Sequence, residues 1–130
     1  MQFDQDYYNQ LSGKIINSCI EVHKQVGPGL LESVYQVCLE KEFELNQIQY
    51  KTQVPIPVIY KGIPTGKDFY MDFLVEDKII LELKSVENLI PIFDAQLITY
   101  LRLANKKLGL IINFNVPVLK SGIKRLVNNF

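Results

Sequence analysis

The sequence is poor in the residues that build thiolate metal sites, disulfide frameworks and membrane spans. It has one histidine, His23, and two cysteines, Cys19 and Cys38, whose spacing fits no zinc-ligand pattern. All three fall in apolar helical patterns, which indicates a core histidine and two free thiols, and hence a reducing compartment. No apolar run could span a bilayer, and residues 1–10 resemble no targeting peptide. We therefore expect a cytoplasmic protein that makes no membrane contact.

Repeats, low-complexity tracts and flexible linkers are also missing from the 130 residues. This absence predicts a single domain over residues 1–130, with residues 1–10 as a polar lead-in. The segment Gly27-Pro28-Gly29 lacks the Lys-Ser/Thr of a phosphate-binding loop, so we interpret it as punctuation between two helices.

Net charge is absent as well, because 14 basic residues balance 14 acidic ones. The distribution is nevertheless uneven. Residues 1–48 hold seven acids against three lysines, and no acid follows Asp94. The basic residues of that last part are Arg102, Lys106, Lys107, Lys120, Lys124 and Arg125. Two interpretations stay open: a positive face that attracts phosphates, or charges that only solvate helix surfaces.

Hydrophobic periodicity predicts a mixed α/β fold of order ααβββαβα. Pro55 and Pro57 lack ladder donors, so their strand should be bulged or lie at a sheet edge. A helix between the third and fourth strands implies a right-handed crossover and a central mixed sheet flanked by helices. The expected helices are residues 11–26, 30–46, 92–105 and 117–129, and the expected strands are 49–60, 68–76, 78–84 and 107–114.

Strand parity brings three ionisable residues together. Odd positions of both central strands are apolar and should face the core, so Asp72, Glu82 and Lys84 should project from the opposite, solvent-facing side. A three-residue loop at 76–78 would pair position 75 with 79 and set Asp72 opposite Glu82. Carboxylates so placed repel one another, and a divalent cation removes that penalty.

Two carboxylates with room for water suit an octahedral Mg²⁺ or Mn²⁺ site. Such a metal activates water and neutralises phosphate charge, and Lys84 would orient the attacking water or stabilise developing negative charge. The alternative is a solvated hairpin that carries an ordinary Glu–Lys surface pair, because Glu-x-Lys alone is a weak motif.

The pattern Asp72…Glu82-Leu83-Lys84 on adjacent strands resembles the PD-(D/E)XK nuclease superfamily. The stretch Gly29-Leu30-Leu31-Glu32-Ser33-Val34-Tyr35 looks like the signature of the GxxExxY protein family within it, over about residues 12–128. The resemblance implies a restriction-endonuclease-like fold and a metal-dependent nuclease. One departure is Met71, which stands where the superfamily name has proline.

Two further elements are similar to the exonuclease branch of that superfamily, and they imply roles for Glu32, Gln96 and Tyr100. Glu32 would point into the metal site as a third ligand, directly or through water. Gln96 and Tyr100 match a Gln-x-x-x-Tyr motif that contacts substrate or supports the site. Tyr35 would bond a site carboxylate or only pack. Without the resemblance, the residues favour a surface residue for Gln96 and a core residue for Tyr100, and Glu32 can equally be a first-turn acid stabilised by the helix dipole.

We therefore expect hydrolysis of nucleic acid, DNA before RNA, by a metal-activated water. One alternative is a catalytically weak or inert accessory module that binds nucleic acid and keeps the nuclease fold. A third is a purely structural protein in which another subunit covers the face of Asp72, Glu82 and Lys84. Neutral charge and small size are compatible with a protein partner or a homodimer.

Overall fold

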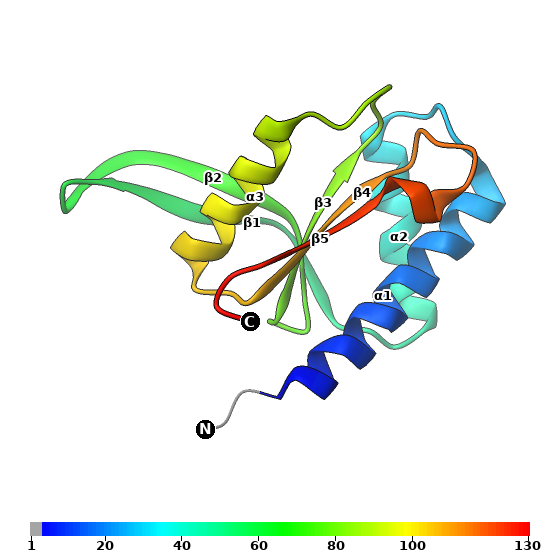
Figure 1. Ribbon diagram of the computed structural model, residues 1–130, viewed down its shortest axis with the longest axis horizontal. Coiled ribbons are helices and arrows are strands. Elements are labelled where there is room, and N and C mark those ends of the chain that lie inside the picture. Colours follow the sequence, from blue (N-terminus) through cyan, green and yellow to red (C-terminus); the bar gives the residue numbers. More distant parts are fainter. Residues whose placement is uncertain (1–3) are drawn as a thin grey trace.

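A computed structural model describes residues 4–130 as a twisted five-stranded sheet with helices on both faces (Figure 1). The strands lie side by side in chain order, and all neighbours are antiparallel except β3 and β4. Helix α3 connects these two parallel strands, as expected for a crossover. The elements are α1 (Gln5–Val26), α2 (Glu32–Leu45), β1 (Tyr50–Tyr60), β2 (Ile63–Val75), β3 (Ile79–Lys84), α3 (Pro91–Ala104), β4 (Leu108–Asn113), η1 (Leu119–Gly122) and β5 (Ile123–Val127).

The sheet is buried on both faces, which divides the core in two. Helices α1 and α2 cover one face, and α3 covers the other (Figure 1). Along β3, Ile79, Leu81 and Leu83 pack toward α1 and α2. Ile80 packs toward α3 with Leu74 of β2. A strand that is apolar at successive positions fits a parallel pairing covered by helices.

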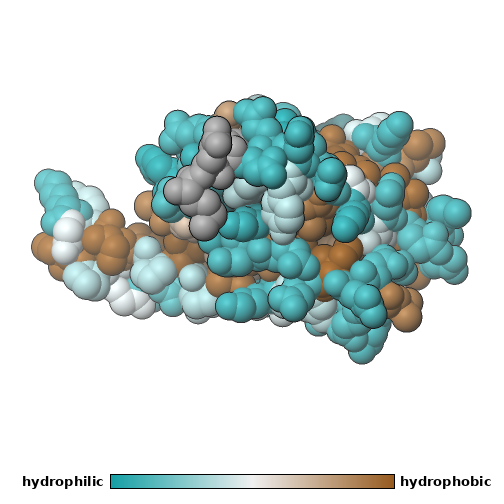
Figure 2. Space-filling view, turned by 90° about the horizontal axis from the view of Figure 1, so that it is seen from below, coloured by the Kyte–Doolittle hydropathy of each residue, from teal (hydrophilic) through white to brown (hydrophobic). Residues whose placement is uncertain are grey.

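Strands β1 and β2 extend beyond the sheet as a two-stranded hairpin arm, residues 54–71 (Figures 1 and 2). The arm protrudes because β2 pairs with β3 only over residues 73–75. Its root packs on α3 through Ile56 and Phe69, whereas residues 59–68 are exposed. Edge strand β1 holds Pro55 and Pro57, and the register shifts after Pro57, so the expected edge or bulge is confirmed on both counts.

The expected fold class is confirmed, and the boundaries of seven elements match closely except that α1 and β2 each begin five or six residues earlier than expected. The lead-in is wrong in part, because Asp4 caps a helix that already begins at Gln5. Residues 1–3 lie outside the described part. The single histidine and the thiols behave as expected: His23 Nε2 lies 2.8 Å from the carbonyl oxygen of Val116, and both cysteines are free.

The expected helix at 117–129 is wrong. The segment forms the short η1 and then β5, which pairs antiparallel with the open edge of β4. Its apolar residues do not share one side: Ile123 packs with the α1–α2 core and Leu126 with the α3 core. A strand satisfies the backbone groups of that edge, and tertiary pairing of this kind overrides a helix-like pattern in a short segment.

The expected solvent-facing side of the carboxylates is also wrong. That side of the sheet carries Leu74, Ile80 and Ile111 under α3, and Glu82 itself is only 6% exposed. One residue in the sequence indicated that this side is buried: Ile80 is apolar although it lies at an even position, between Ile79 and Leu81. Among residues 4–130, no helix is both long enough and apolar enough to cross a membrane.

Gly122 makes a close approach that β5 requires. A Cβ built on Gly122 would lie 2.2 Å from the backbone oxygen of Asn113. We expect Gly122→Ala to lower the free energy of unfolding by about 1–3 kcal/mol, because the backbone must shift to admit the methyl group. Gly13, in α1, has open space around its Cβ position. Gly13→Ala should therefore stabilise by about 0.5–1 kcal/mol. Urea unfolding of both variants measures the contrast, and equal stabilities would refute it.

Candidate active site

The β2–β3 ladder stops where the two carboxylates lie. The last ladder pair is Phe73–Leu81, and β1 also has no ladder partner for Asp72. At this point side chains replace backbone pairing: the Asp72 N–H donates to Glu82 Oε2 at 2.9 Å, and the Leu83 N–H donates to Asp72 Oδ2 at 2.8 Å. We call this pair of bonds the carboxylate clasp. It holds Asp72 against Glu82 across the end of the ladder, where the register that pairs Val75 with Ile79 predicts it.

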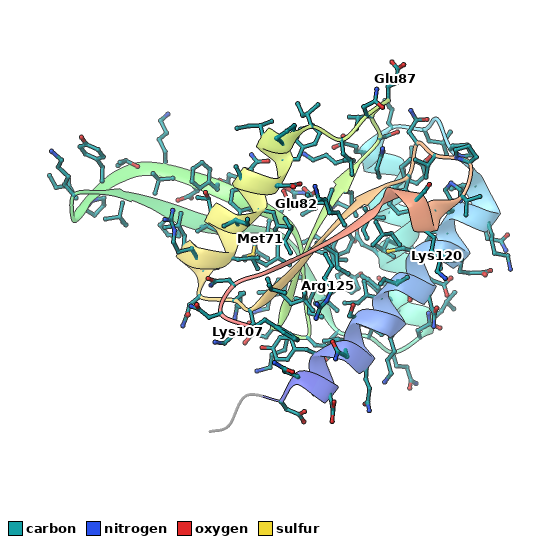
Figure 3. All side chains as sticks on the ribbon, viewed as in Figure 1. Met71, Glu82, Glu87, Lys107, Lys120 and Arg125 are labelled. Carbon is teal, nitrogen blue, oxygen red and sulfur yellow. The ribbon has the colours of Figure 1, made fainter. Side chains whose placement is uncertain are left out.

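Glu82 is buried and Asp72 is half-buried, so the electrostatics of the clasp are unfavourable without a counter-ion. Burial, together with the charge of Asp72, raises the pKa of Glu82 from 4.5 to about 8. Burial also raises the pKa of Asp72, which the Leu83 N–H and the Lys84 charge oppose. Figure 3 shows Glu82 on β3, on the side of the sheet where α3 lies. Two carboxylates in so little water cannot both ionise easily.

Lys84 is the positive charge nearest to this pair along the chain. It follows Glu82 by two residues on β3, and its charge lowers the pKa of both carboxylates. Its Nζ lies 4.3 Å from the centre of the Phe93 ring on α3. A cation over an aromatic face is held there electrostatically while it keeps its N–H donors for other partners. The structure thus brings Asp72, Glu82 and Lys84 together.

A loop before α2 brings a third acid to the rim of the site. Gly29 adopts a φ of 85°, a conformation that favours glycine, and Glu32 opens α2 three residues later. Glu32 Oε2 lies 3.4 Å from the backbone nitrogen of Ser85, directly after Lys84, and its charge raises the pKa of both clasp carboxylates. Glu32 is therefore both a first-turn acid and a neighbour of the clasp.

Of the two alternatives for Tyr35, the structure does not show the bond to a site carboxylate and shows a packed side chain instead. Its hydroxyl donates to the carbonyl of Gly27 at 2.6 Å and accepts from the Leu30 N–H at 3.1 Å. Its ring is fully buried and stacks on Phe114 at 4.3 Å. Tyr35 thereby fixes the loop that places Glu32. It affects the carboxylates only indirectly, through the position of Glu32.

Tyr100 and Gln96 stand on the other side of the clasp, on α3. Tyr100 is 5% exposed and packs against Phe69 at a ring separation of 5.3 Å. Burial raises the pKa of its hydroxyl, and the charges of Glu82 and Asp72 add to that rise, so Tyr100 lies within their electrostatic reach. Gln96, one turn earlier, is exposed beside Tyr100 and has no described contact with the carboxylates.

Sequence reasoning missed two residues that shape the site. Gln53 sits on β1 opposite Asp72 with a positive φ of 50°, hydrogen-bonds that carboxylate, and donates to Gln36 of α2 at 3.0 Å. The buried Asn113 binds both backbone groups of Val86, which fixes the segment after Lys84. Neither had a motif, although a polar residue that ends the apolar run of β4 was a signal for Asn113.

The donor set suits a hard divalent cation. One oxygen of each clasp carboxylate accepts a backbone N–H, and the second oxygen of each can take another ligand. A cation there would relieve the charge repulsion that raises the pKa of Glu82. No three acidic, histidine or cysteine side chains among residues 4–130 already form a ligand cluster. Glu32 thus stands beside the pair rather than in it.

The basic residues of the last third do not gather beside the carboxylates. Lys106 pairs with Asp77, and Lys124 pairs with Asp94. Figure 3 shows Lys107 and Lys120 at well-separated places on the molecule. The structure therefore favours the interpretation that these charges solvate separate surfaces.

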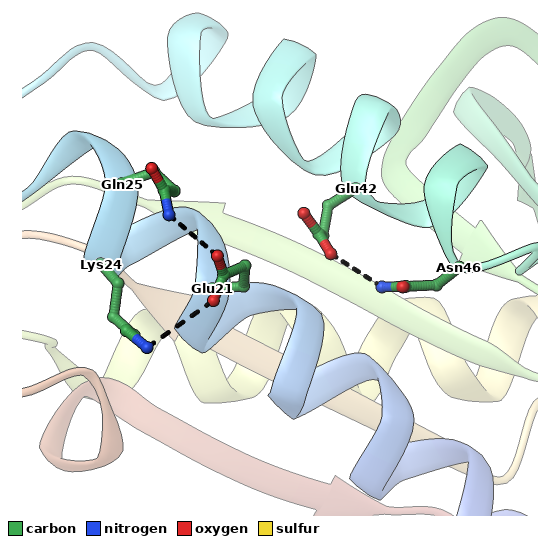
Figure 4. A network of polar contacts seen from close by, with 5 residues as sticks. All are labelled: Glu21, Lys24, Gln25, Glu42 and Asn46. Carbon is green, nitrogen blue, oxygen red and sulfur yellow. Dashed lines mark hydrogen bonds and ion pairs between the residues drawn. The ribbon is translucent and has the colours of Figure 1, made fainter.

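A groove of about 970 Å³ lies elsewhere, between α1 and α2. Its polar residues bond one another, as Figure 4 shows for Glu42 with Asn46 and for Glu21 with Gln25 and Lys24. Asn46 also donates to Ser18 and so links the two helices. These are ordinary surface contacts, so the carboxylate site is the stronger candidate for a functional site.

We predict that the metal-free protein loses stability as pH rises from about 5 to above 8. The pKa of Glu82 is raised on folding, so the fold favours the protonated acid, and that contribution disappears as pH passes the folded value of about 8. Melting temperatures in chelator should fall over this range, and Glu82→Gln should flatten the profile because glutamine mimics the protonated acid. An equally steep profile in Glu82→Gln would show that other groups cause it.

Comparison with known families agrees with this geometry. A family model described as the PD-(D/E)XK nuclease superfamily matches residues 9–126, which include the clasp, Lys84, Glu32 and α3. Comparisons with curated proteins and with solved structures give no match. The five-stranded mixed sheet with helices on both faces is consistent with the restriction-endonuclease-like fold expected from the sequence. The chain belongs to the PD-(D/E)XK nuclease superfamily.

Proposed function

We propose that this chain is a metal-dependent nuclease that hydrolyses phosphodiester bonds of DNA, in preference to RNA, at the carboxylate clasp. The observation that carries the proposal is the clasp itself. Backbone N–H groups hold the half-buried Asp72 and the buried Glu82 together with Lys84 beside them, at an electrostatic cost that a divalent cation would remove. A solvated surface pair would have no such burial.

The residues of the chain divide the work as follows. Asp72 and Glu82 would hold Mg²⁺ or Mn²⁺, and the clasp fixes the orientation of both carboxylates. Lys84, steadied over Phe93, donates a hydrogen bond to the attacking water or to a phosphate oxygen as negative charge develops. When bound, the cation supplies Lewis-acid activation of water and neutralises phosphate charge.

Glu32 completes the metal site through water or by a change of side-chain rotamer. Its carboxylate lies at the rim, where the Ser85 N–H orients it. Each residue of the GxxExxY signature has a physical task in the loop before α2: Gly29 turns the loop, Tyr35 fixes it by a hydrogen bond, and Glu32 is presented to the clasp. For this reason we assign the chain to the GxxExxY family.

Removing the side chain of Asp72, Glu82 or Lys84 should strongly lower the rate of cleavage. We predict that Asp72→Ala, Glu82→Ala and Lys84→Ala each lower the rate by a factor of about 100 or more, as is typical for groups that stabilise transition-state charge. The measurement is Mg²⁺- or Mn²⁺-dependent release of product from single-stranded, duplex and branched DNA and from RNA. Glu87→Gln and Lys41→Ala change exposed residues of the same types and should leave the rate unchanged.

Mn²⁺ titration by calorimetry separates this proposal from an inert accessory module. An enzyme binds Mn²⁺, loses that binding in Asp72→Asn and cleaves at least one substrate. A pure preparation that is inactive on every substrate with both metals contradicts the nuclease proposal. A protein that also binds no Mn²⁺ favours the purely structural alternative.

Glu32→Gln should raise the metal concentration needed for half-maximal activity by about 10-fold or more, which is the usual effect of removing an outer metal-site partner. Saturating Mn²⁺ should restore much of the rate, because Asp72 and Glu82 remain. An unchanged metal requirement would show that Glu32 serves only the helix terminus. Glu40→Gln, two turns further along α2, is the matched control.

A further inference from the structure

A hollow outside the proposed metal site adjoins the carboxylate clasp. It has a volume of about 380 Å³ and lies between α3 and the root of the hairpin arm. Its walls are largely apolar, and the lining residues that matter here are Phe69, Phe93, Ala95, Gln96 and Tyr100. We call it the aromatic pocket.

The aromatic pocket is continuous with the site because the two share walls. Phe93 lines the pocket and also lies under Lys84 Nζ. Tyr100 lines the pocket and lies within electrostatic reach of both clasp carboxylates. A substrate whose phosphate meets Lys84 therefore has its neighbouring nucleoside at the mouth of this pocket.

The composition of the pocket matches a nucleobase. Aromatic rings offer stacking surfaces to any base, and such stacking is tolerant of sequence. Gln96 is exposed at the same rim and brings one amide, whose donor and acceptor can bind a base edge. A purely apolar ligand would leave that amide without a partner.

We infer that the aromatic pocket receives one unpaired base next to the scissile phosphate, so the substrate is single-stranded nucleic acid or an unwound end. This inference rests on the proposed nuclease function and specifies its substrate class. In a duplex the base is stacked and paired, and extruding it costs a few kcal/mol. An unpaired strand enters the pocket without that cost.

The arm offers a continuation of the strand path. Lys67 precedes Phe69 by two residues on β2 and so shares its face of the strand. Lys67 is exposed, and a cation there can meet a phosphate beside the bound base. The exposed Lys61, close to the tip, adds a second cation.

The test is a substitution that fills the aromatic pocket and leaves the carboxylate clasp unchanged. Ala95 is exposed and lines the pocket, so Ala95→Trp should block it while the core stays intact. Leu103→Trp places the same side chain on exposed α3 surface outside the pocket and is the matched control. Affinities for a short single strand and for the same sequence as duplex are measured by fluorescence anisotropy with Ca²⁺.

We expect Ala95→Trp to weaken single-strand binding about tenfold, the effect of losing one stacked base, and Leu103→Trp to leave it unchanged. Wild-type protein should bind the single strand more tightly than the duplex. Removing one base next to the cleavage position, as an abasic site, should weaken wild-type binding but not that of Ala95→Trp. Equal effects of the two tryptophans, or a preference for duplex, would overturn the inference.

A spectroscopic readout is independent of turnover. The chain has no tryptophan, so Phe93→Trp introduces a single fluorophore into the pocket wall. Stacking of a base should quench it on addition of single-stranded DNA, whereas Leu103→Trp should stay bright. Quenching in Phe93→Trp together with no cleavage by the wild-type protein would sink the nuclease proposal and keep the pocket. Cleavage by the wild-type protein, with no quenching in Phe93→Trp and no effect of Ala95→Trp, would overturn the pocket inference and keep the nuclease proposal.

Discussion

The carboxylate clasp is the constraint on which the rest of the site depends. Two like charges are forced together because each accepts an N–H that the interrupted β2–β3 ladder would otherwise leave without a partner. The need to satisfy backbone donors therefore works against electrostatic repulsion between Asp72 and Glu82. The result is a pair of carboxylates already held in position, so the cation that we propose would bind with little reorganisation of the protein.

The surrounding elements meet at this one break in the sheet. The loop before α2 presents Glu32, α3 supplies Phe93 beneath Lys84, and the root of the arm closes the aromatic pocket. The arm exists for the same reason as the clasp: β2 leaves β3 after three ladder pairs and continues with β1 alone. The proposed metal site and the proposed strand-binding surface thus share a single structural cause.

Local sequence patterns predicted the strand register, whereas contacts with other elements decided which face of the sheet is buried. Period-two alternation and the short 76–78 loop correctly predicted the register that sets Asp72 opposite Glu82. The same alternation misjudged the face, because a strand buried on both sides carries apolar residues at every position and hides which side a helix covers. The last segment failed for a related reason, since the open edge of β4 decides its conformation.

By itself the sequence determined the order of the first seven elements, the edge strand marked by Pro55 and Pro57, and the trio that the β2–β3 register brings together. Those features follow from side-chain period and turn chemistry, which are local. Only the tertiary structure decided that the site is buried, that Tyr35 holds a loop rather than a carboxylate, that Gln53 joins Asp72, and that an aromatic pocket opens beside Lys84. Each of these depends on contacts between segments far apart in the chain, and no local pattern encodes such contacts.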